Sequence, residues 1–164
     1  MAGRPRAPIY VIDSSSWISI EGHPAQNRIL WHVGKLIEEG RAICPPEAHA
    51  EVKTVSQVLA WLDQYEGKQV RAISDADYLL RVGQVAFRFP QMAGVRGGKE
   101  KADQYIVAMA LHLTEKTSAQ HVAVSEETSA RRPSRKLSTA CAVLGVPHRN
   151  LIGMLRDEFP DEDF

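Results

Sequence analysis

The sequence predicts an α/β fold, a three-layer sandwich in which helices flank a central, mainly parallel β-sheet on both faces. Short, β-branched apolar runs alternate along the chain with longer segments whose apolar residues recur at helical spacing. Parallel strands need crossover connections of a dozen or more residues, and helices usually supply them. The chain has 164 residues without an internal repeat or linker, which is less than the ~250 at which cores divide, so we expect a single domain.

Continuous apolar runs predict strands that are buried on both faces of the sheet. Ile9–Ile12 predicts the first, Ala42–Cys44 the second and Val122–Val124 the third. Val146 is expected in or beside a short terminal strand. Because these runs lie far apart in the sequence, each pair is joined by a segment long enough for a crossover helix.

Helical spacing of apolar residues defines the segments between and after these strands. Gly40 closes the first helix as a C-cap, and Pro45-Pro46 opens the second because proline is tolerated in the first helical turn. Ser74 or Asp75 caps a later helix whose apolar face includes Leu79 and Leu80. A loop with Gly94, Gly97 and Gly98 follows that helix. The expected helices are Asn27–Glu39, Glu47–Val52, Val55–Tyr65, 75–89, Lys101–Leu113, Leu137–Leu144 and Leu151–Glu158.

Composition and charge exclude several functional classes. Lys plus Arg equals Asp plus Glu at 20 each, so contact with nucleic acid would depend on local basic patches. Cys44 and Cys141 form neither a disulfide framework nor a zinc spacing, and we expect them to be buried thiols. The six histidines show no HExxH pattern, and no GxSxG, P-loop or GxGxxG motif occurs.

The ends of the chain carry no targeting or membrane signal that we recognise. The apolar run after the basic N-terminus is too short for a signal peptide, and no later stretch reaches the ~18 apolar residues that span a bilayer. We therefore expect a cytoplasmic protein. We also expect a core over about 8–157, with flexible ends at 1–7 and 158–164.

Acidic residues directly follow two of the predicted strands. Asp13 ends the first strand and Glu126-Glu127 ends the third, so a parallel sheet would bring both to its carboxyl edge, where ligands bind. Asp103 lies in the first turn of a helix, and Glu51 lies one turn after Glu47. Spacing alone leaves the alternatives open, because each acid also fits a cap, a turn or a solvated helix position.

Four segments, in chain order, resemble the motifs of the PIN-domain nucleases. Tyr10-Val11-Ile12-Asp13-Ser14-Ser15-Ser16 resembles the opening strand, and Pro45–Val52 resembles the segment of the second acid, with Glu51 a better match than Glu47. Lys101–Ala110 is similar to the third motif, in which Ala-Asp opens a small-residue helix. Val122-Ala123-Val124-Ser125-Glu126-Glu127 resembles the fourth, in the register that selects Glu127.

The resemblance extends over about residues 8–157 and includes one departure from the wider family. The usual fourth acid is Asp, whereas Glu127 resembles an uncharacterised branch of PIN-like bacterial proteins with a Thr/Ser-x-Glu motif. Lys136–Val146, a Cys-bearing helix before a Leu-Gly-Val turn, resembles the same branch.

What the resemblance implies is a divalent-metal ribonuclease. Asp13 and Asp103 would ligate Mg²⁺ or Mn²⁺, hard cations that keep several waters, while Glu51 and Glu127 would hold coordinated waters or a second ion. Attack by an activated water would leave a 5′-phosphate and a 3′-hydroxyl. The supporting residues would be Ser14, Ser15, Ser125 and Glu126.

Positive charge for an RNA substrate is available in two places. Lys99 and Lys101 precede Asp103, and a second group follows Glu127. That second group consists of Arg131, Arg132, Arg135 and Lys136. A solvated basic loop is the alternative explanation for it, since no aromatic residues are interleaved to stack on bases.

Two other functions remain open at this stage. One is phosphate transfer through Asp13 as nucleophile, although Ser15 occupies the position where a second Asp is usual. The other is a catalytically silent binding module that keeps the fold. Within the PIN resemblance, the small single-domain form is similar to the VapC-type toxins of bacterial toxin–antitoxin pairs, which implies an antitoxin partner and a homodimer.

Overall fold

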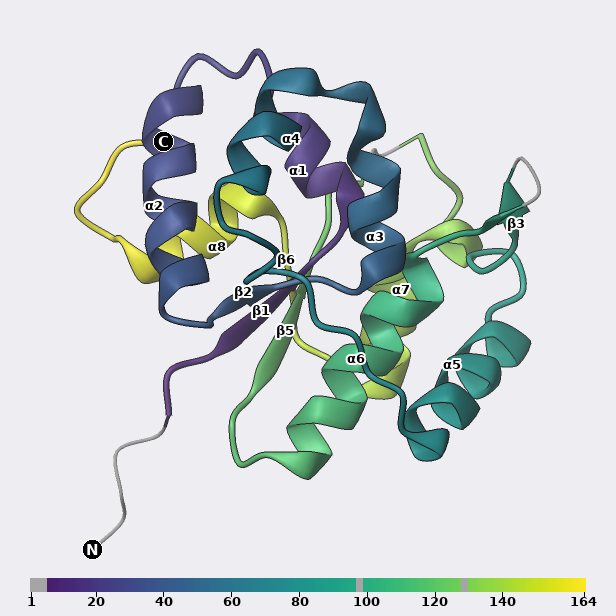
Figure 1. The fold of residues 1–164 in the computed structure, drawn as a ribbon. Coiled ribbons are helices and arrows are strands. Elements are labelled where there is room, and N and C mark those ends of the chain that lie inside the picture. The colour runs from purple at the N-terminus through teal and green to yellow at the C-terminus, as the bar shows by residue number, and fades with distance from the viewer. Residues whose placement is uncertain (1–5, 97–98, 128–129) are drawn as a thin grey trace, which may run out of the picture.

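A four-stranded, all-parallel sheet lies at the centre of the computed structural model, which describes residues 6–96, 99–127 and 130–164 (Figure 1). The strands are, in spatial order, β2 (Ala42–Ile43), β1 (Ile9–Ile12), β5 (His121–Val124) and β6 (His148–Arg149). β1 pairs with β5 along its whole length, from Ile9 opposite His121 to Ile12 opposite Val124. The predicted α/β sandwich with a parallel sheet is confirmed.

Helices cover both faces of the sheet, because alternate residues of each strand point to opposite sides (Figure 1). Tyr10 and Ile12 face one layer, and Val11 and Ala123 face the other. The layer that packs on Tyr10 and Ile12 contains α1 (Ser14–Ile20), α2 (Gln26–Glu38), α4 (Ser56–Asp63) and α8 (Leu151–Glu158). The layer that packs on Val11 and Ala123 contains α5 (Ala76–Arg88), α6 (Asp103–Lys116) and α7 (Leu137–Leu144).

Short elements connect these layers at the carboxyl edge of the sheet. α3 (Pro46–Glu51) begins just after β2 with a proline in its first turn, and it continues into the 3-10 turn η1 (Val52–Thr54). A second 3-10 turn, η2 (Pro133–Arg135), precedes α7. The helices therefore start within a residue or two of their predicted positions, and the expected crossovers are present.

α1 is a helix that we did not predict from the sequence. Three consecutive serines favour a turn, because serine hydroxyls compete for backbone hydrogen bonds in a helix interior. In the structure Asp13 caps the helix by accepting a hydrogen bond from the Ser15 amide, and Trp17 and Ile20 are fully buried. Burial of these two large side chains outweighs the weak helix propensity of the serines.

The apolar face of α5 also differs from the prediction. Leu79 and Leu80 are 55% and 64% exposed, whereas Tyr78, Val82 and Val85 form the buried stripe against the core. Residues 78, 82 and 85 share one side of a helix, and a leucine pair beside them cannot face the same way. The predicted apolar face of this helix is therefore wrong at Leu79 and Leu80.

The glycine-rich segment after α5 is more regular than the predicted loop. β3 (Val95–Arg96) and β4 (Lys99–Glu100) pair antiparallel. Gly94, with a φ of 155°, precedes β3 in a conformation that favours glycine. Gly97 and Gly98, which the sequence also assigned to the loop, lie outside the described residues.

The C-terminal segment 158–164, which the sequence predicts to be flexible, contacts the rest of the protein in the structure. The Tyr10 hydroxyl donates to Glu158 at 2.6 Å, and Arg41 pairs with the same carboxylate. The rings of Phe159 and Phe164 lie 4.3 and 5.2 Å from the ring of His32 on α2. Two aromatic residues in an otherwise acidic tail provide enough apolar surface to hold it in place.

Two further expectations concern the cysteines and the membrane. Cys44 and Cys141 are free, buried thiols, as predicted, and burial raises the pKa of each to about 12. Across the described ranges, no helix has both the length and the apolar character needed to cross a membrane.

Candidate active site

A cavity of about 910 Å³ opens at the carboxyl edge of the sheet. Its walls come from α1, α3, η1, the start of α6 and the segment after β5. All four predicted acids and all four supporting residues line it, as do two of the predicted cations. These residues are Asp13, Ser14, Ser15, Glu51, Lys101, Asp103, Ser125, Glu126, Glu127 and Arg131. Parallel pairing of β1 and β5 explains the convergence, because both strands end at this edge.

Asp13 is the most enclosed acid of the cavity, with 5% of its surface exposed. Its Oδ2 accepts hydrogen bonds from the Ser15 hydroxyl at 2.6 Å and from the Ser15 amide at 3.2 Å. Its Oδ1 is buried and has no hydrogen-bond partner among the described residues. Burial, reinforced by the charge of Glu51, raises the pKa of Asp13. One carboxylate oxygen is thus held by the protein and the other is left available.

Asp103 faces the same cavity from the first turn of α6. Burial and the nearby charge of Asp13 raise its pKa to about 7, although Arg131 and Lys101 act in the opposite direction. A carboxyl with a pKa near neutrality is costly to ionise in the absence of a cation. Asp13 and Asp103 therefore form a coupled acidic pair to which further positive charge would bind favourably.

Glu51 has both carboxylate oxygens engaged by neighbouring elements. Its Oε2 accepts from the Ser14 hydroxyl at 2.5 Å, and its Oε1 accepts from the Ala102 amide at 3.1 Å. These bonds connect α3 with the starts of α1 and α6, which carry the Asp13 and Asp103 positions. Glu47, the fallback candidate for the second acid, also lines the cavity, but these contacts favour Glu51.

The adjacent acids Glu126 and Glu127 contact different helices. Glu127 accepts from the Ser138 amide at 3.2 Å and from the Ser138 hydroxyl, at the N-terminus of α7. Glu126 accepts from the Leu151 amide at 2.7 Å, at the N-terminus of α8, and from the Ser16 hydroxyl at 3.2 Å. Both interactions suit a negative charge at a helix start. Glu126 fits a structural role, whereas Glu127 is anchored while it faces the cavity.

The three serines named from the sequence have different contacts. Ser14 and Ser15 hold the carboxylates of Glu51 and Asp13, and the Ser15 hydroxyl also accepts from the Glu126 amide at 3.0 Å. Ser125 instead hydrogen-bonds His148 Nε2 at 2.8 Å and has no contact of this kind with the acids. Orientation of carboxylates is therefore a property of Ser14 and Ser15.

The predicted RNA-binding residues are only partly brought to the cavity. Arg131 and Lys101 line it, whereas Arg132, Arg135 and Lys136 do not, and both of those arginines are exposed to solvent. The side chain of Lys99 lies outside the described part of the structure.

Lys53 and Tyr105 line the cavity although the sequence analysis did not select them. Lys53 lies two residues after Glu51, and its proximity to a predicted acid could have marked it as a candidate site residue. Tyr105 lies two residues after Asp103. Tyrosine is common in apolar cores, so spacing alone does not single it out.

The donor set fits a divalent cation bound mainly through water. Within the described ranges, no group of three or more His, Cys, Asp or Glu side chains is arranged to hold a metal ion by itself. Asp13 Oδ1 is an unpartnered buried oxygen, and Asp103 lies close enough to interact with it electrostatically. Mg²⁺ takes one or two carboxylates and keeps several waters, so these two acids suffice as direct ligands.

Comparison with known proteins identifies a family but no characterised relative. No curated protein matches the chain. A family model described as "Domain of unknown function (DUF4411)" matches residues 10–159, which includes every strand of the sheet except the first residue of β1 and all four acids of the cavity. The chain belongs to this DUF4411 family.

Proposed function

We propose that this protein is a divalent-metal-dependent endoribonuclease of the PIN-domain type. The observation that carries the proposal is the convergence of Asp13, Glu51, Asp103 and Glu127 in one cavity at the carboxyl edge of a parallel sheet. The raised pKa values of the buried pair Asp13 and Asp103 add to it, because clustered carboxylates are favourable chiefly around a cation.

Asp13 and Asp103 would hold Mg²⁺ or Mn²⁺. When bound, such an ion lowers the pKa of a coordinated water and polarises the phosphate. Ser15 fixes the orientation of the Asp13 carboxylate, so the other carboxylate oxygen is already positioned to bind the metal ion. Glu51 and Glu127, each anchored by hydrogen bonds, would accept hydrogen bonds from waters in the cavity. Lys101 and Arg131 would bind oxygens of the scissile phosphate.

The first experiment is cleavage of a mixed-sequence single-stranded RNA by the purified protein with Mg²⁺, with Mn²⁺ or with EDTA. We expect cleavage with either metal, no cleavage with EDTA, and 5′-phosphate ends on the products. A matched preparation of the Asp13→Asn variant controls for contaminating nuclease. If the RNA stays intact with Mg²⁺ and with Mn²⁺, the protein does not cleave generic single-stranded RNA, which contradicts the proposal. That result would favour a binding module with the same fold.

The biological role that we propose is the toxin of a bacterial toxin–antitoxin pair, with an antitoxin protein as partner and the cytoplasm as location. The PIN resemblance supports this role, since the single-domain size is similar to that of such toxins. Co-expression with a neighbouring small gene should then suppress the growth defect that the nuclease causes alone.

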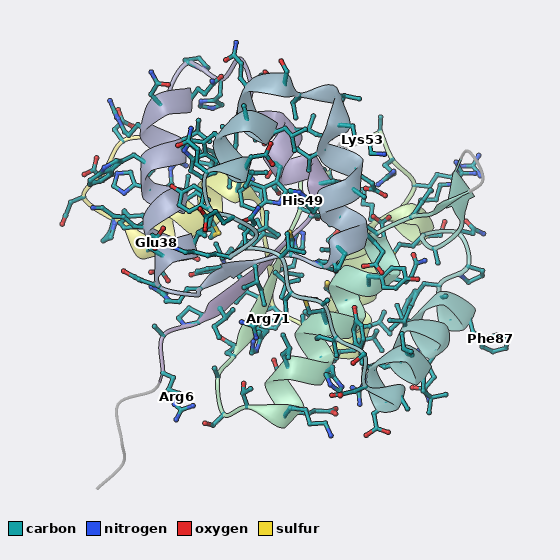
Figure 2. The ribbon with its side chains drawn as sticks, in the orientation of Figure 1. Arg6, Glu38, His49, Lys53, Arg71 and Phe87 are labelled. Carbon is teal, nitrogen blue, oxygen red and sulfur yellow. The ribbon has the colours of Figure 1, made fainter. Side chains whose placement is uncertain are left out.

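We also propose a homodimer, formed by the exposed face of α5. Leu79, Leu80 and Phe87 are exposed on this face, and Phe87, 89% exposed, projects into solvent (Figure 2). Leu79, Leu80, Gly83 and Phe87 lie on one side of the helix, so two copies of this face can pack antiparallel across a two-fold axis near Gly83. Patches of exposed leucine and phenylalanine of this kind mark association surfaces.

A charge in place of the most exposed apolar residue of this face should disrupt the dimer. We expect Phe87→Asp to be monomeric in sedimentation equilibrium at concentrations where the wild type is dimeric. Val143→Asp, which changes another exposed apolar residue, 53% exposed on α7, is the matched control. A wild type that stays monomeric at every concentration would contradict the proposed dimer.

A further inference from the structure

One wall of the cavity lies outside the four acidic motifs. It consists of Ile18 of α1 and the adjacent Lys53 and Thr54 of η1, two elements that pack against each other. Ile18 is 37% exposed, and both η1 side chains are exposed as well. The wall therefore presents an apolar surface next to an ammonium and a hydroxyl group.

The position of Lys53 is determined by its neighbours in the chain. Val52 is fully buried and Val55 is 8% exposed, and the Val55 amide donates to the Val52 carbonyl at 3.4 Å. The two residues between these buried valines must face outward, toward the cavity. Figure 2 labels Lys53 just beyond the end of α3. An anchored turn thus presents its lysine to the cavity at little cost in backbone entropy.

Lys53 differs in its contacts from three other lysines of the protein. Lys68 pairs with Glu38, Lys116 pairs with Asp77, and Lys35 lies over the ring of Trp31. Within the described ranges, Lys53 makes no ion pair, although it shares a cavity with several carboxylates. An unpaired ammonium beside a polar cavity is available to an anionic ligand.

We infer that Ile18, Lys53 and Thr54 form a subsite for a nucleotide that neighbours the scissile phosphate. Lys53 would bind a backbone phosphate, Thr54 would donate a hydrogen bond to it, and Ile18 would contact the face of the base. This inference rests on the proposed ribonuclease function and extends it to an RNA strand that crosses the cavity.

Cations from three separate segments of the chain support a strand rather than a single nucleotide as the ligand. Arg131 follows β5 and Lys101 precedes α6, whereas Lys53 belongs to the turn after α3. Asp13 and Asp103 line the same cavity. A single phosphate positioned for cleavage beside these acids cannot also contact cations from all three segments. Successive phosphates of one strand can.

Binding is best measured in the Asp13→Asn background, because RNA then stays intact. A fluorescein-labelled single-stranded oligonucleotide is titrated at several salt concentrations, followed by anisotropy. We expect Lys53→Gln to weaken binding by about fivefold, as for a favourable exposed ion pair. It should also reduce the slope of log affinity against log salt by about 0.7, the loss of one phosphate contact on a single strand.

Two further variants separate the subsite from general electrostatics. Lys53→Arg should bind like the parent protein, and Ile18→Ser should bind more weakly with an unchanged salt slope. Lys68→Gln removes the same charge outside the cavity and is the matched control, for which we expect no change. Circular dichroism establishes that each variant is folded.

The outcomes distinguish this inference from the function on which it rests. If Lys53→Gln and Lys68→Gln bind RNA as tightly as the parent, the subsite is overturned while the ribonuclease proposal stands. If the parent itself binds no RNA at low salt, both are overturned.

Discussion

Replacing Asp13 with asparagine should reduce RNA cleavage by about 10²- to 10³-fold, since loss of one electrostatic contact at the reacting centre costs this much in other enzymes. The change keeps the shape of the side chain and its contact with Ser15, but it removes the charge next to the unpartnered oxygen. Initial rates of cleavage of a labelled RNA with saturating Mn²⁺ measure the effect. The loss should appear in kcat, because Asp13 would hold the metal ion that acts on the reacting phosphate.

Asp161→Asn is the matched control for this result. Asp161 is exposed in the C-terminal segment and does not line the cavity, so its variant should cleave RNA at the wild-type rate. Full activity of Asp13→Asn would show that the cavity is not the catalytic centre. Equal losses in both variants would point to a folding defect, which thermal unfolding detects.

The stability of the metal-free protein should fall as the pH rises toward neutrality. The pKa of Asp103 is about 7 in the folded protein and 3.8 without its environment, so the folded state holds the extra proton between these values. A raised acidic pKa contributes stability below pH 3.8, and this contribution is lost as the pH passes through about 7. The burial of Asp13 acts in the same direction.

Asp103→Asn should remove most of this pH dependence. Asparagine carries no charge to bury, so we expect the metal-free variant at pH 8 to exceed the wild type by on the order of 4 kcal/mol in free energy of unfolding. Urea denaturation at a series of pH values, in EDTA, measures this difference. Asp161→Asn should follow the wild-type curve.

Divalent metal should reverse the effect in the wild type more than in the variant. Mn²⁺ at about a hundred times its dissociation constant should raise the wild-type free energy of unfolding at pH 8 by roughly 2.7 kcal/mol. The Asp103→Asn variant should gain much less, because it has lost one of the two direct carboxylates. Equal stabilisation of both proteins would remove Asp103 from the proposed metal site.

The sequence alone determined the order of the elements and the shared edge of the two acids that follow strands. Strand runs such as Ile9–Ile12 and helix stripes such as that of α6 are local patterns, and parallel pairing then requires Asp13 and Glu127 to share an edge. Local sequence did not determine α1, whose serines form a helix because Trp17 is buried against the sheet.

Contacts between distant residues decided the rest of the site. The hydrogen bonds of Glu51 to Ser14 and Ala102, the placement of Lys53 in the cavity and the packing of Phe164 on α2 each depend on segments far apart in the chain. Periodicity reports which face of an element is buried, but it carries no information on which element lies opposite. Only the tertiary structure therefore separates the acids with an available oxygen from the acids that hold the framework together.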